Sequence, residues 1–359
     1  RYLWTDAFAV CNYLELHHRT GNVAYLQNAR DLVDQVHNEL GRQRVDHPRA
    51  GWISGLSDSN GGRHPTRGGL RIGKKLDQRG PNEPVDERLE WERDGQYFHY
   101  LTKWMHALNR VTSVTGDPRY NLWALELAKV AHTGFAYKPI SGGPKRMYWK
   151  MSIDLTYPLV ASMGQHDPLD GLITYKQLQA TAVEYNQTAD APGLDAEIAD
   201  FEAMCEGRKW STDDALGIGG LLADACRLSQ LITAHDPGES RRLVGLLGDA
   251  EVSLDSFVAH LDYPVEYRLA FRELGLAIGI HAIDKMRDTT TRFPERSSVR
   301  NEFNTLLSRF RKFLPLSEHI ECCWLEPVNQ HSRNWVEHLD INSVMLATSL
   351  APDGYLILG

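Results

Sequence analysis

Apolar residues recur at helical spacing along most of the chain. Between residues 4 and 18, apolar side chains from Ala7 to Leu14 occupy positions i, i+3, i+4 and i+7, which is typical of an amphipathic helix. A second stripe follows over residues 23–40, after a short polar turn. No strong alternation of the strand type appears, and strands do not alternate with helices. The pattern therefore predicts an all-α chain of helical hairpins.

The same spacing predicts helices over 94–115, 120–132, 171–185, 194–206, 214–233, 239–260, 267–286, 299–314 and 340–350. Two long segments rich in Gly, Pro and charged residues, 41–86 and 134–169, interrupt this rhythm. Irregular segments of this length are uncommon in a compact domain unless they have a function or are mobile.

Two of the predicted turns share a pattern. Thr20-Gly21-Asn22-x-x-Tyr25 matches Thr115-Gly116-Asp117-x-x-Tyr120, and each is followed by an Ala and a Leu at the same offsets. In this pattern glycine ends the first helix and Asn or Asp caps the second. The match indicates an internal repeat of one hairpin.

Six predicted helices have an acidic residue at the start and continue with small apolar residues: those at Asp6, Asp94, Asp170, Asp214, Glu273 and Asp340. Two of them contain closely spaced glycines, at 217, 219 and 220 and at 275 and 279. Glycine costs a helix roughly 1 kcal/mol relative to alanine. We therefore expect these glycines to permit close approach of neighbouring helices.

The repeated turns and the glycine-containing helices with acidic starts make the chain similar to the six-hairpin glycosidase-like superfamily. This resemblance implies one (α/α)6 toroid over residues 1–359, with six inner helices alternating with outer ones and long loops at the mouth. The inner helices are also similar to those of LanC-like cyclases and terpenoid-cyclase toroids. LanC-like enzymes bind zinc through separated cysteines and a histidine, whereas Cys322 and Cys323 are adjacent, so we expect neither a metal nor a cofactor.

Composition narrows the function further. The net charge is −8 and the pI about 6.0, which disfavours a nucleic-acid partner. No apolar run reaches the roughly 18–20 residues of a membrane helix, so we expect no membrane partner. The five cysteines form no CxxC pair and are expected to be reduced, in a cytoplasmic protein. Arg1 already lies in a helical pattern, and whether residues precede it is left open. The oligomeric state is left open.

In a toroid, the N-terminal ends of the inner helices meet at one mouth, where crowded carboxylates take different acid and base roles. Several tryptophans precede these helices, and aromatic faces stack on sugar rings. We therefore expect an oligosaccharide or glycoside substrate and a glycoside hydrolase with a carboxylic acid and carboxylate pair. The candidates for that pair are Asp94, Glu90, Asp214 and Glu326. The candidate substrate-binding residues are Trp91, Trp149, Trp210, Trp335, Gln96, Arg146 and Arg333.

Two alternatives remain open. One is a sugar epimerase of the N-acylglucosamine 2-epimerase type, in which paired histidines transfer protons, here His166 and His338. His166 lies in a cluster, Gln165-His166-Asp167-Pro168-Leu169-Asp170, that also fits a plain capped turn. The other alternative is a non-catalytic helical binding or scaffold protein. No P-loop, dinucleotide fingerprint, HExxH or GxSxG motif is present in the sequence, so nucleotide-dependent chemistry is not expected.

Overall fold

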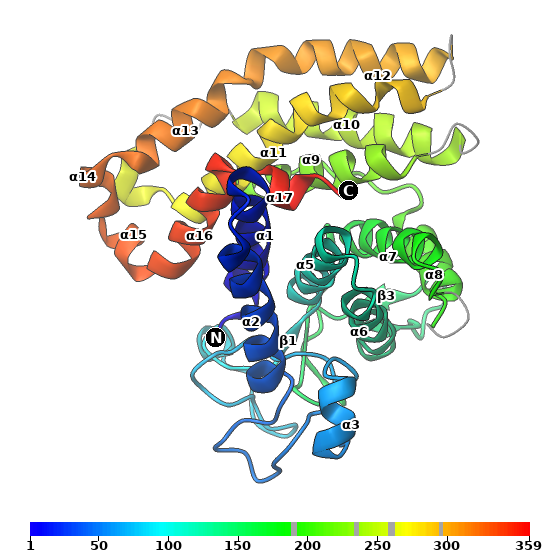
Figure 1. Cartoon of the computed structure of the whole chain (residues 1–359), viewed down its shortest axis with the longest axis vertical. Helices are drawn as coiled ribbons and strands as arrows, with labels where there is room; N and C mark the ends of the chain where they lie inside the picture. Colours follow the sequence, from blue (N-terminus) through cyan, green and yellow to red (C-terminus); the bar gives the residue numbers. More distant parts are fainter. Residues whose placement is uncertain (188–191, 233–236, 258–262, 294–296) are drawn as a thin grey trace. The chain divides into compact units, whose positions relative to one another are not determined.

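The structure is a computed structural model that describes residues 1–187, 192–232, 237–257, 263–293 and 297–359 (Figure 1). Helices account for 66% and strands for 4% of it, so the predicted all-α class is confirmed. No helix in the described ranges is long and apolar enough to cross a membrane. The predicted helix ends near 233 and 260 lie outside the described residues.

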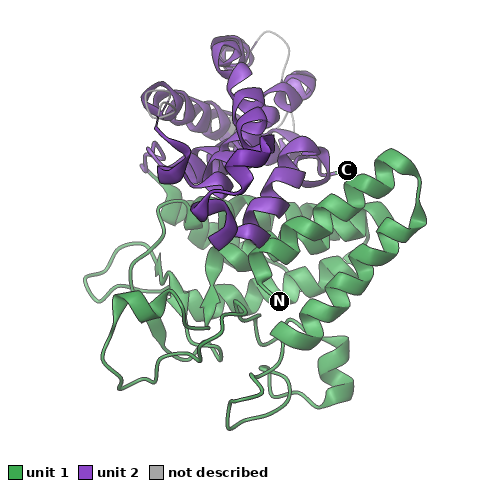
Figure 2. Ribbon diagram, turned by 90° about the vertical axis from the view of Figure 1, so that its left-hand side faces the viewer, with its two compact units in different colours: residues 1–206, 359 green, residues 207–358 purple. Residues whose placement is uncertain are grey.

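The chain divides into two compact units, shown in separate colours in Figure 2. Unit 1 comprises residues 1–206 with Gly359, and unit 2 comprises residues 207–358.

Unit 1 contains three helical hairpins. Their helices are α1 (Leu3–Thr20), α2 (Val23–Leu40), α5 (Phe98–Thr115), α6 (Arg119–Phe135), α7 (Asp167–Glu184) and α8 (Asp195–Cys205). Helix α5 packs between α1 and α7. Near its start, Lys103 pairs with Asp170 of α7, and further along Asn109 bonds Thr181 of α7. Contacts in this order show that α5 and α7 run parallel, with their N-terminal ends together.

The two turns of the predicted repeat have the same geometry. Gly21 and Gly116 adopt left-handed backbone angles, with φ of 66° and 70°, and end α1 and α5. The hydroxyls of Thr20 and Thr115 each accept a hydrogen bond at 3.2 Å from the backbone N–H two residues later. Left-handed glycine is the usual way to end a helix, and the threonine bond then directs the chain into the return helix. The repeat is therefore confirmed as a repeated turn structure.

The long segments of unit 1 carry its other short elements: α3 (Asp58–Arg63), α4 (Glu87–Glu90), β1 (Gln96–Tyr97), β2 (Ala136–Tyr137), β3 (Arg146–Met147), β4 (Lys150–Met151) and β5 (Pro158–Val160). Strands β1, β4 and β5 form one antiparallel sheet, and β2 pairs with β3. The prediction that a helix begins at Asp94 is wrong. Gly95 has a φ of 150° and leads into β1, so that α5 begins only at Phe98.

Unit 2 contains α9 (Ala215–Leu231), α10 (Pro237–Phe257), α11 (Ala270–Asp288), α12 (Ser298–Arg309), α13 (Pro315–Leu325), α14 (Pro327–Gln330), α15 (Arg333–Glu337), α16 (Leu339–Leu350) and α17 (Asp353–Leu356). Short 3₁₀ turns lie at Val265–Tyr267, Thr289–Arg292 and Phe310–Phe313. Helix α13 was not predicted. Its buried residues Leu316, Ile320 and Trp324 recur every four positions, but adjacent cysteines and the nearby Pro327 hide this stripe.

The glycines of α9 and α11 bring these two helices into close contact. A methyl group added at Gly219 would lie 2.0 Å from the backbone oxygen of Gly275, and one at Gly279 would lie 2.6 Å from the Cα atom of Gly219. The expected close approach is confirmed. Asp214 before α9 pairs with Arg272 near the start of α11 at 2.5 Å, so the N-terminal ends of these two helices also lie together.

Helix α16 continues this arrangement in unit 2. The backbone N–H of Phe271 donates to the Asn342 side chain of α16 at 2.9 Å, and the ring of Phe271 contacts His338, which precedes α16. The starts of α11 and α16 are therefore neighbours. In unit 1, Trp4 near the start of α1 contacts His99 and Tyr100 near the start of α5. Each unit thus has three helices whose N-terminal ends come together.

Candidate functional site

Aromatic side chains gather at the N-terminal ends of the three neighbouring helices of unit 1. Trp4 comes from α1, and Tyr97, His99 and Tyr100 surround the start of α5. Trp149 precedes β4, and Asp167 is the first residue of α7. We call this set of six residues the His99 cluster.

His99 lies at the centre of the cluster. Its ring stacks on Trp149 at 6.1 Å between centroids and 17° between planes, and it contacts Trp4 at 6.1 Å and Tyr100 at 4.9 Å. Tyr97 packs against Trp149 at 5.4 Å. Trp149 is partly exposed, and Trp91 on its far edge is 54% exposed. The cluster therefore offers aromatic surface of the kind that binds the apolar face of a sugar.

The acid group of the cluster is Asp167, which is buried. Burial, followed by the negative charge of Asp170, raises the pKa of Asp167 to about 7. Asp170 is itself held by Thr102 and by the ammonium of Lys103, 2.9 Å away. The helix dipole favours negative charge in this first turn by about 0.3–1 kcal/mol. Asp170 pairs with Lys103 of α5, and the charge of Asp170 disfavours a second negative charge on Asp167 in the same buried turn.

Asp167 faces a neutral imidazole. Its Oδ1 atom lies 3.8 Å from Nδ1 of His99, too far for a hydrogen bond. Burial, and then the charge of Lys103, lowers the pKa of His99 to about 3. Near neutral pH, His99 is therefore uncharged while Asp167 exchanges its proton.

Three buried polar atoms of the cluster have no hydrogen-bond partner among the described residues: Nε1 of Trp4, Nδ1 of His99 and Oδ2 of Asp167. Buried polar groups are nearly always satisfied. Their concentration in one cluster, together with a carboxyl group that titrates near pH 7, gives the site the properties of a proton-transferring ligand site.

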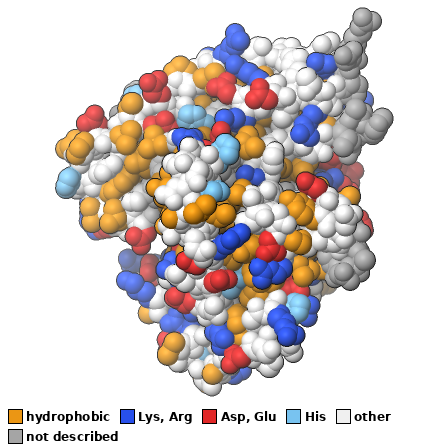
Figure 3. Space-filling model, viewed as in Figure 1, with side chains coloured by type: hydrophobic (Ala, Val, Ile, Leu, Met, Phe, Trp, Pro, Cys, Tyr) orange, Lys and Arg blue, Asp and Glu red, His pale blue; other side chains and the backbone are white. Residues whose placement is uncertain are grey.

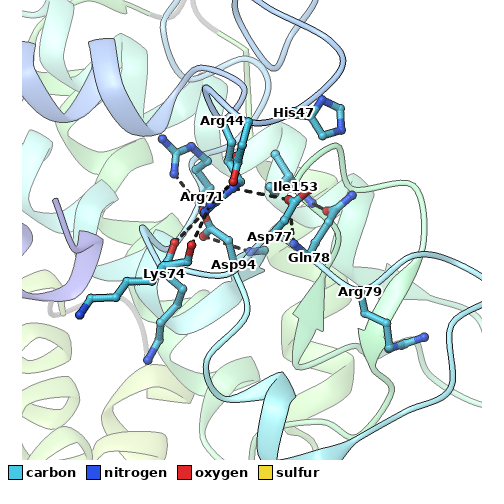
Figure 4. A network of polar contacts seen from close by, with 12 residues as sticks. Arg44, His47, Arg71, Lys74, Asp77, Gln78, Arg79, Asp94 and Ile153 are labelled. Atoms are coloured by element: carbon cyan, nitrogen blue, oxygen red, sulfur yellow. Dashed lines mark hydrogen bonds and ion pairs between the residues drawn. The ribbon is translucent and has the colours of Figure 1, made fainter.

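Asp94, a predicted catalytic residue, is instead the centre of a buried ion-pair network (Figure 4). It is fully buried, and it accepts bonds from Arg71 at 2.9 Å and from Arg44 at 3.3 Å. The backbone N–H groups of Gly73 and Gly95 also donate to it, at 2.9 and 3.1 Å. With two cations and two amides bound, this carboxylate anchors the loop 71–75 beside residues 93–95.

Glu90, the second predicted carboxylate of this region, is also buried. Arg79 donates to it at 2.6 Å, and Lys150 lies 3.6 Å away. The Lys150 ammonium donates to the backbone oxygens of Glu90 and Arg93, and burial lowers its pKa to about 8. It lies 5.4 Å from the ring centre of Tyr97. Lys150 therefore contacts the ring of Tyr97, a member of the His99 cluster, and joins it to Glu90.

The predicted substrate-binding residues of unit 1 separate into three groups. Trp149 belongs to the His99 cluster, and Trp91 packs on it at 5.1 Å. Gln96 is fully buried and bonds the backbone at Leu70, Gly68 and Ile153. Arg146 is exposed on β3. Of these four predicted residues, the two tryptophans are thus the ones with ring contacts to the cluster among the described residues.

In unit 2, the predicted residues around α9 have structural partners. Asp214 caps α9 by accepting from the backbone N–H of Gly217 at 3.0 Å, in addition to its pair with Arg272. Trp210 is buried, and its backbone N–H donates to Asp249 at 2.9 Å.

The predicted residues before α16 lie mostly on the surface. Glu326, Arg333 and His338 are exposed, whereas Trp335 is buried and stacks on Trp324 at 5.8 Å. Large apolar side chains are exposed on the same helices, at Leu325, Val328, Val336 and Leu339. Hydrophobic side chains gather over this region in Figure 3. This surface of unit 2 therefore carries both charged and apolar side chains. Glu326, the predicted catalytic carboxylate in this region, is exposed and not buried.

His166 lies next to Asp167, directly before α7, and is partly exposed. The sequence pattern indicated chemistry in the segment 165–170, but it favoured His166 as the reacting residue. His99 was missed, although it follows Asp94-Gly95-Gln96-Tyr97, because the pattern there favoured the acidic residue at an assumed helix start. No group of three His, Cys, Asp or Glu residues in the described ranges could hold a metal ion. No protein-family model and no curated protein matches the chain.

Proposed function

We propose that the two units together form an (α/α)6 toroid. Each unit supplies three neighbouring helices with adjacent N-terminal ends, α1, α5 and α7 in unit 1 and α9, α11 and α16 in unit 2. Helices α2, α6, α8 and α10 each return from one of them. Six such helices in one ring would carry all their N-terminal ends at a single mouth. The repeated turn at Gly21 and Gly116 supports this reading, because repeated hairpins are the units of such a ring.

We further propose that the chain is a carbohydrate-active enzyme, a glycoside hydrolase, with its proton donor in the His99 cluster. One observation carries the proposal: Asp167 is a buried carboxyl group with an unpartnered oxygen, placed beside stacked aromatic rings. A glycosidase needs an acid that is still protonated near neutral pH, and burial is the usual means of providing it. The rings of Trp149 and Trp91 would bind the faces of the sugar units.

In this mechanism Asp167 donates its proton to the glycosidic oxygen as the bond from that oxygen to the anomeric carbon breaks. Water then bonds to the anomeric carbon, and the proton that the water loses restores the acid form of Asp167. Burial, and then the negative charge of Asp170, raise the pKa of Asp167 and favour its protonated form in the free enzyme. His99 stays neutral and adds no cation that would stabilise the Asp167 carboxylate. The chain's own charges thus favour the acid form of Asp167 before substrate binds.

The test compares Asp167→Asn with the wild type on two aryl glycosides. For a poor leaving group that needs protonation, kcat should fall about 10²- to 10⁴-fold. For a dinitrophenyl leaving group that needs none, it should stay close to that of the wild type. Asp117→Asn, a turn carboxylate outside the cluster, is the control and should leave both rates unchanged. An equal loss on both substrates would contradict the role of Asp167 as proton donor.

A sugar epimerase is the second candidate, favoured by the neutral imidazole of His99 opposite the acid Asp167. Such a pair can remove and return a proton at one carbon. Reaction in deuterium oxide separates the two enzymes. An epimerase incorporates deuterium at the carbon of an intact sugar, whereas a hydrolase releases a reducing end without it. A chain that binds sugars and turns over none would support a binding protein instead.

A further inference from the structure

Two buried indole N–H groups of unit 1, those of Trp4 and Trp52, have no hydrogen-bond partner among the described residues. Trp4 is 6% exposed, and its Nε1 has no partner in the described part of the chain. Two other indoles of this unit have acceptors: Trp104 donates to His37 at 3.0 Å, and Trp123 donates to the backbone oxygen of Arg63 at 2.8 Å. A buried indole N–H usually finds an acceptor, so the exception requires a reason.

The position of Trp4 supplies one. Its ring packs on His99 at 6.1 Å and on Tyr100 at 5.3 Å, so it belongs to the cluster that contains Asp167. The other unpartnered atoms there are a carboxyl oxygen and an imidazole nitrogen. One donor and two groups able to accept are complementary to a hydroxyl-bearing ligand, because a hydroxyl both donates and accepts.

We propose that Trp4 is a specificity-determining residue whose indole N–H donates a hydrogen bond to an oxygen of the bound sugar. This inference rests on the carbohydrate site proposed above and goes beyond it, because it assigns the recognition of one substrate oxygen to α1. The ligand group opposite Trp4 is an acceptor, a ring hydroxyl or a carbonyl oxygen. A sugar that lacks this oxygen leaves the indole N–H unpaired and binds more weakly.

The indole resonances of the protein labelled with ¹⁵N-tryptophan test this directly. The chain has nine tryptophans, and the signal that disappears in Trp4→Phe assigns Trp4. Glucose, mannose, N-acetylglucosamine and glucuronate are added singly at millimolar concentration. At least one of them should shift the Trp4 N–H signal downfield and slow its exchange with solvent. If none of the four shifts it, the inference is wrong.

Trp52→Phe is the matched control. Its Nε1 is also buried without a partner in the described ranges, but its ring packs against Arg42 and makes no ring contact with the described members of the His99 cluster. For the sugar that shifts Trp4, Trp4→Phe should weaken binding about threefold to tenfold, the value of one neutral hydrogen bond. Trp52→Phe should leave binding unchanged. Equal weakening by both variants, or by neither, would overturn the role of Trp4.

The same experiments separate this inference from the proposed hydrolase. If the sugar shifts the Trp4 signal but no glycoside is cleaved, the hydrolase is wrong and the role of Trp4 stands. If glycosides are cleaved and Trp4→Phe changes neither KM nor kcat, the hydrolase stands and the role of Trp4 is wrong. In an active enzyme Trp4→Phe should raise KM without moving the pH profile, because Asp167 still carries the proton.

Discussion

The Nδ1 atom of His99 lies 3.8 Å from the Oδ1 atom of Asp167, and the two groups have opposite protonation behaviour. Burial raises the pKa of the carboxyl group to about 7 and lowers the pKa of the imidazole to about 3. Both shifts favour the uncharged form, as desolvation requires. The pair is therefore neutral over much of the acidic range and gains a negative charge only near neutral pH.

The first prediction concerns stability. The native state prefers protonated Asp167, so this preference stabilises the fold fully below the ordinary aspartate pKa and is lost as the pH rises through about 7. Asp167→Asn does not titrate. Between pH 4 and pH 8, the free energy of unfolding of this variant should therefore rise by about 4 kcal/mol relative to the wild type. Urea unfolding at both pH values measures this change.

Asp117, which lies in the turn before α6, is the control for the direction in which stability changes with pH. Its hydrogen bonds to Arg119 lower its pKa, so its contribution to stability is present above the ordinary pKa and is lost on acidification. Asp117→Asn should show the opposite trend with pH, of smaller size because Asp117 is partly exposed. A constant difference between Asp167→Asn and the wild type would show that Asp167 has an ordinary pKa.

The second prediction concerns the pH dependence of hydrolysis. An acid catalyst with a pKa of about 7 is active below that value, so kcat/KM should fall about tenfold per pH unit well above it. The measurement is kcat/KM from pH 5 to pH 9 on a glycoside with a poor leaving group. The residual activity of Asp167→Asn should lack this alkaline limb. If the variant shows the same decrease of kcat/KM at alkaline pH, the decrease belongs to the titration of another group.

The third prediction concerns the Asp94 network. Asp94→Asn leaves the guanidinium groups of Arg71 and Arg44 without their shared buried carboxylate, and loss of one partner of a buried ion pair costs about 3–5 kcal/mol. The loss should appear as a lower urea midpoint.

Asp46→Asn is the matched control, because Asp46 pairs with the same Arg44 at 2.8 Å but lies on the surface. Exposed pairs contribute little, so this variant should unfold like the wild type. A small effect at Asp94 would mean that water replaces the carboxylate.

The fourth prediction concerns the contact between α9 and α11. Gly219→Ala places a methyl group against the backbone of Gly275, which no side-chain rotation relieves, and should destabilise unit 2 by about 3 kcal/mol. Thermal unfolding followed by circular dichroism measures this loss.

Gly220→Ala changes the adjacent residue, where a methyl group meets nothing within 4 Å. It should stabilise the chain by about 0.5–1 kcal/mol through helix propensity. Equal effects of the two substitutions would exclude close packing as the reason for Gly219.

Much of the helical framework could be predicted from local signals. The turn at Gly116 needs only the left-handed conformation of glycine and the threonine and aspartate that flank it. The start of α5 could not be predicted, because Gly95 and the pairing of β1 with β4 override the helix-start signal of Asp94. Helix α13 was missed because a stripe of three residues is too short to stand out.

The chemistry divides in the same way. The sequence by itself determined the helices, the repeated turns and the glycines that let α9 and α11 meet, because backbone conformation and periodicity are local properties. It also directed attention to carboxylates at helix starts. Only the tertiary structure decided between these carboxylates: Asp94 pairs with two arginines, Asp214 pairs with Arg272 and caps a helix, and Asp167 is buried with no lysine or arginine bonded to it among the described residues. A pKa depends on desolvation and on charges brought together from distant parts of the chain, and no spacing in the sequence encodes that environment directly.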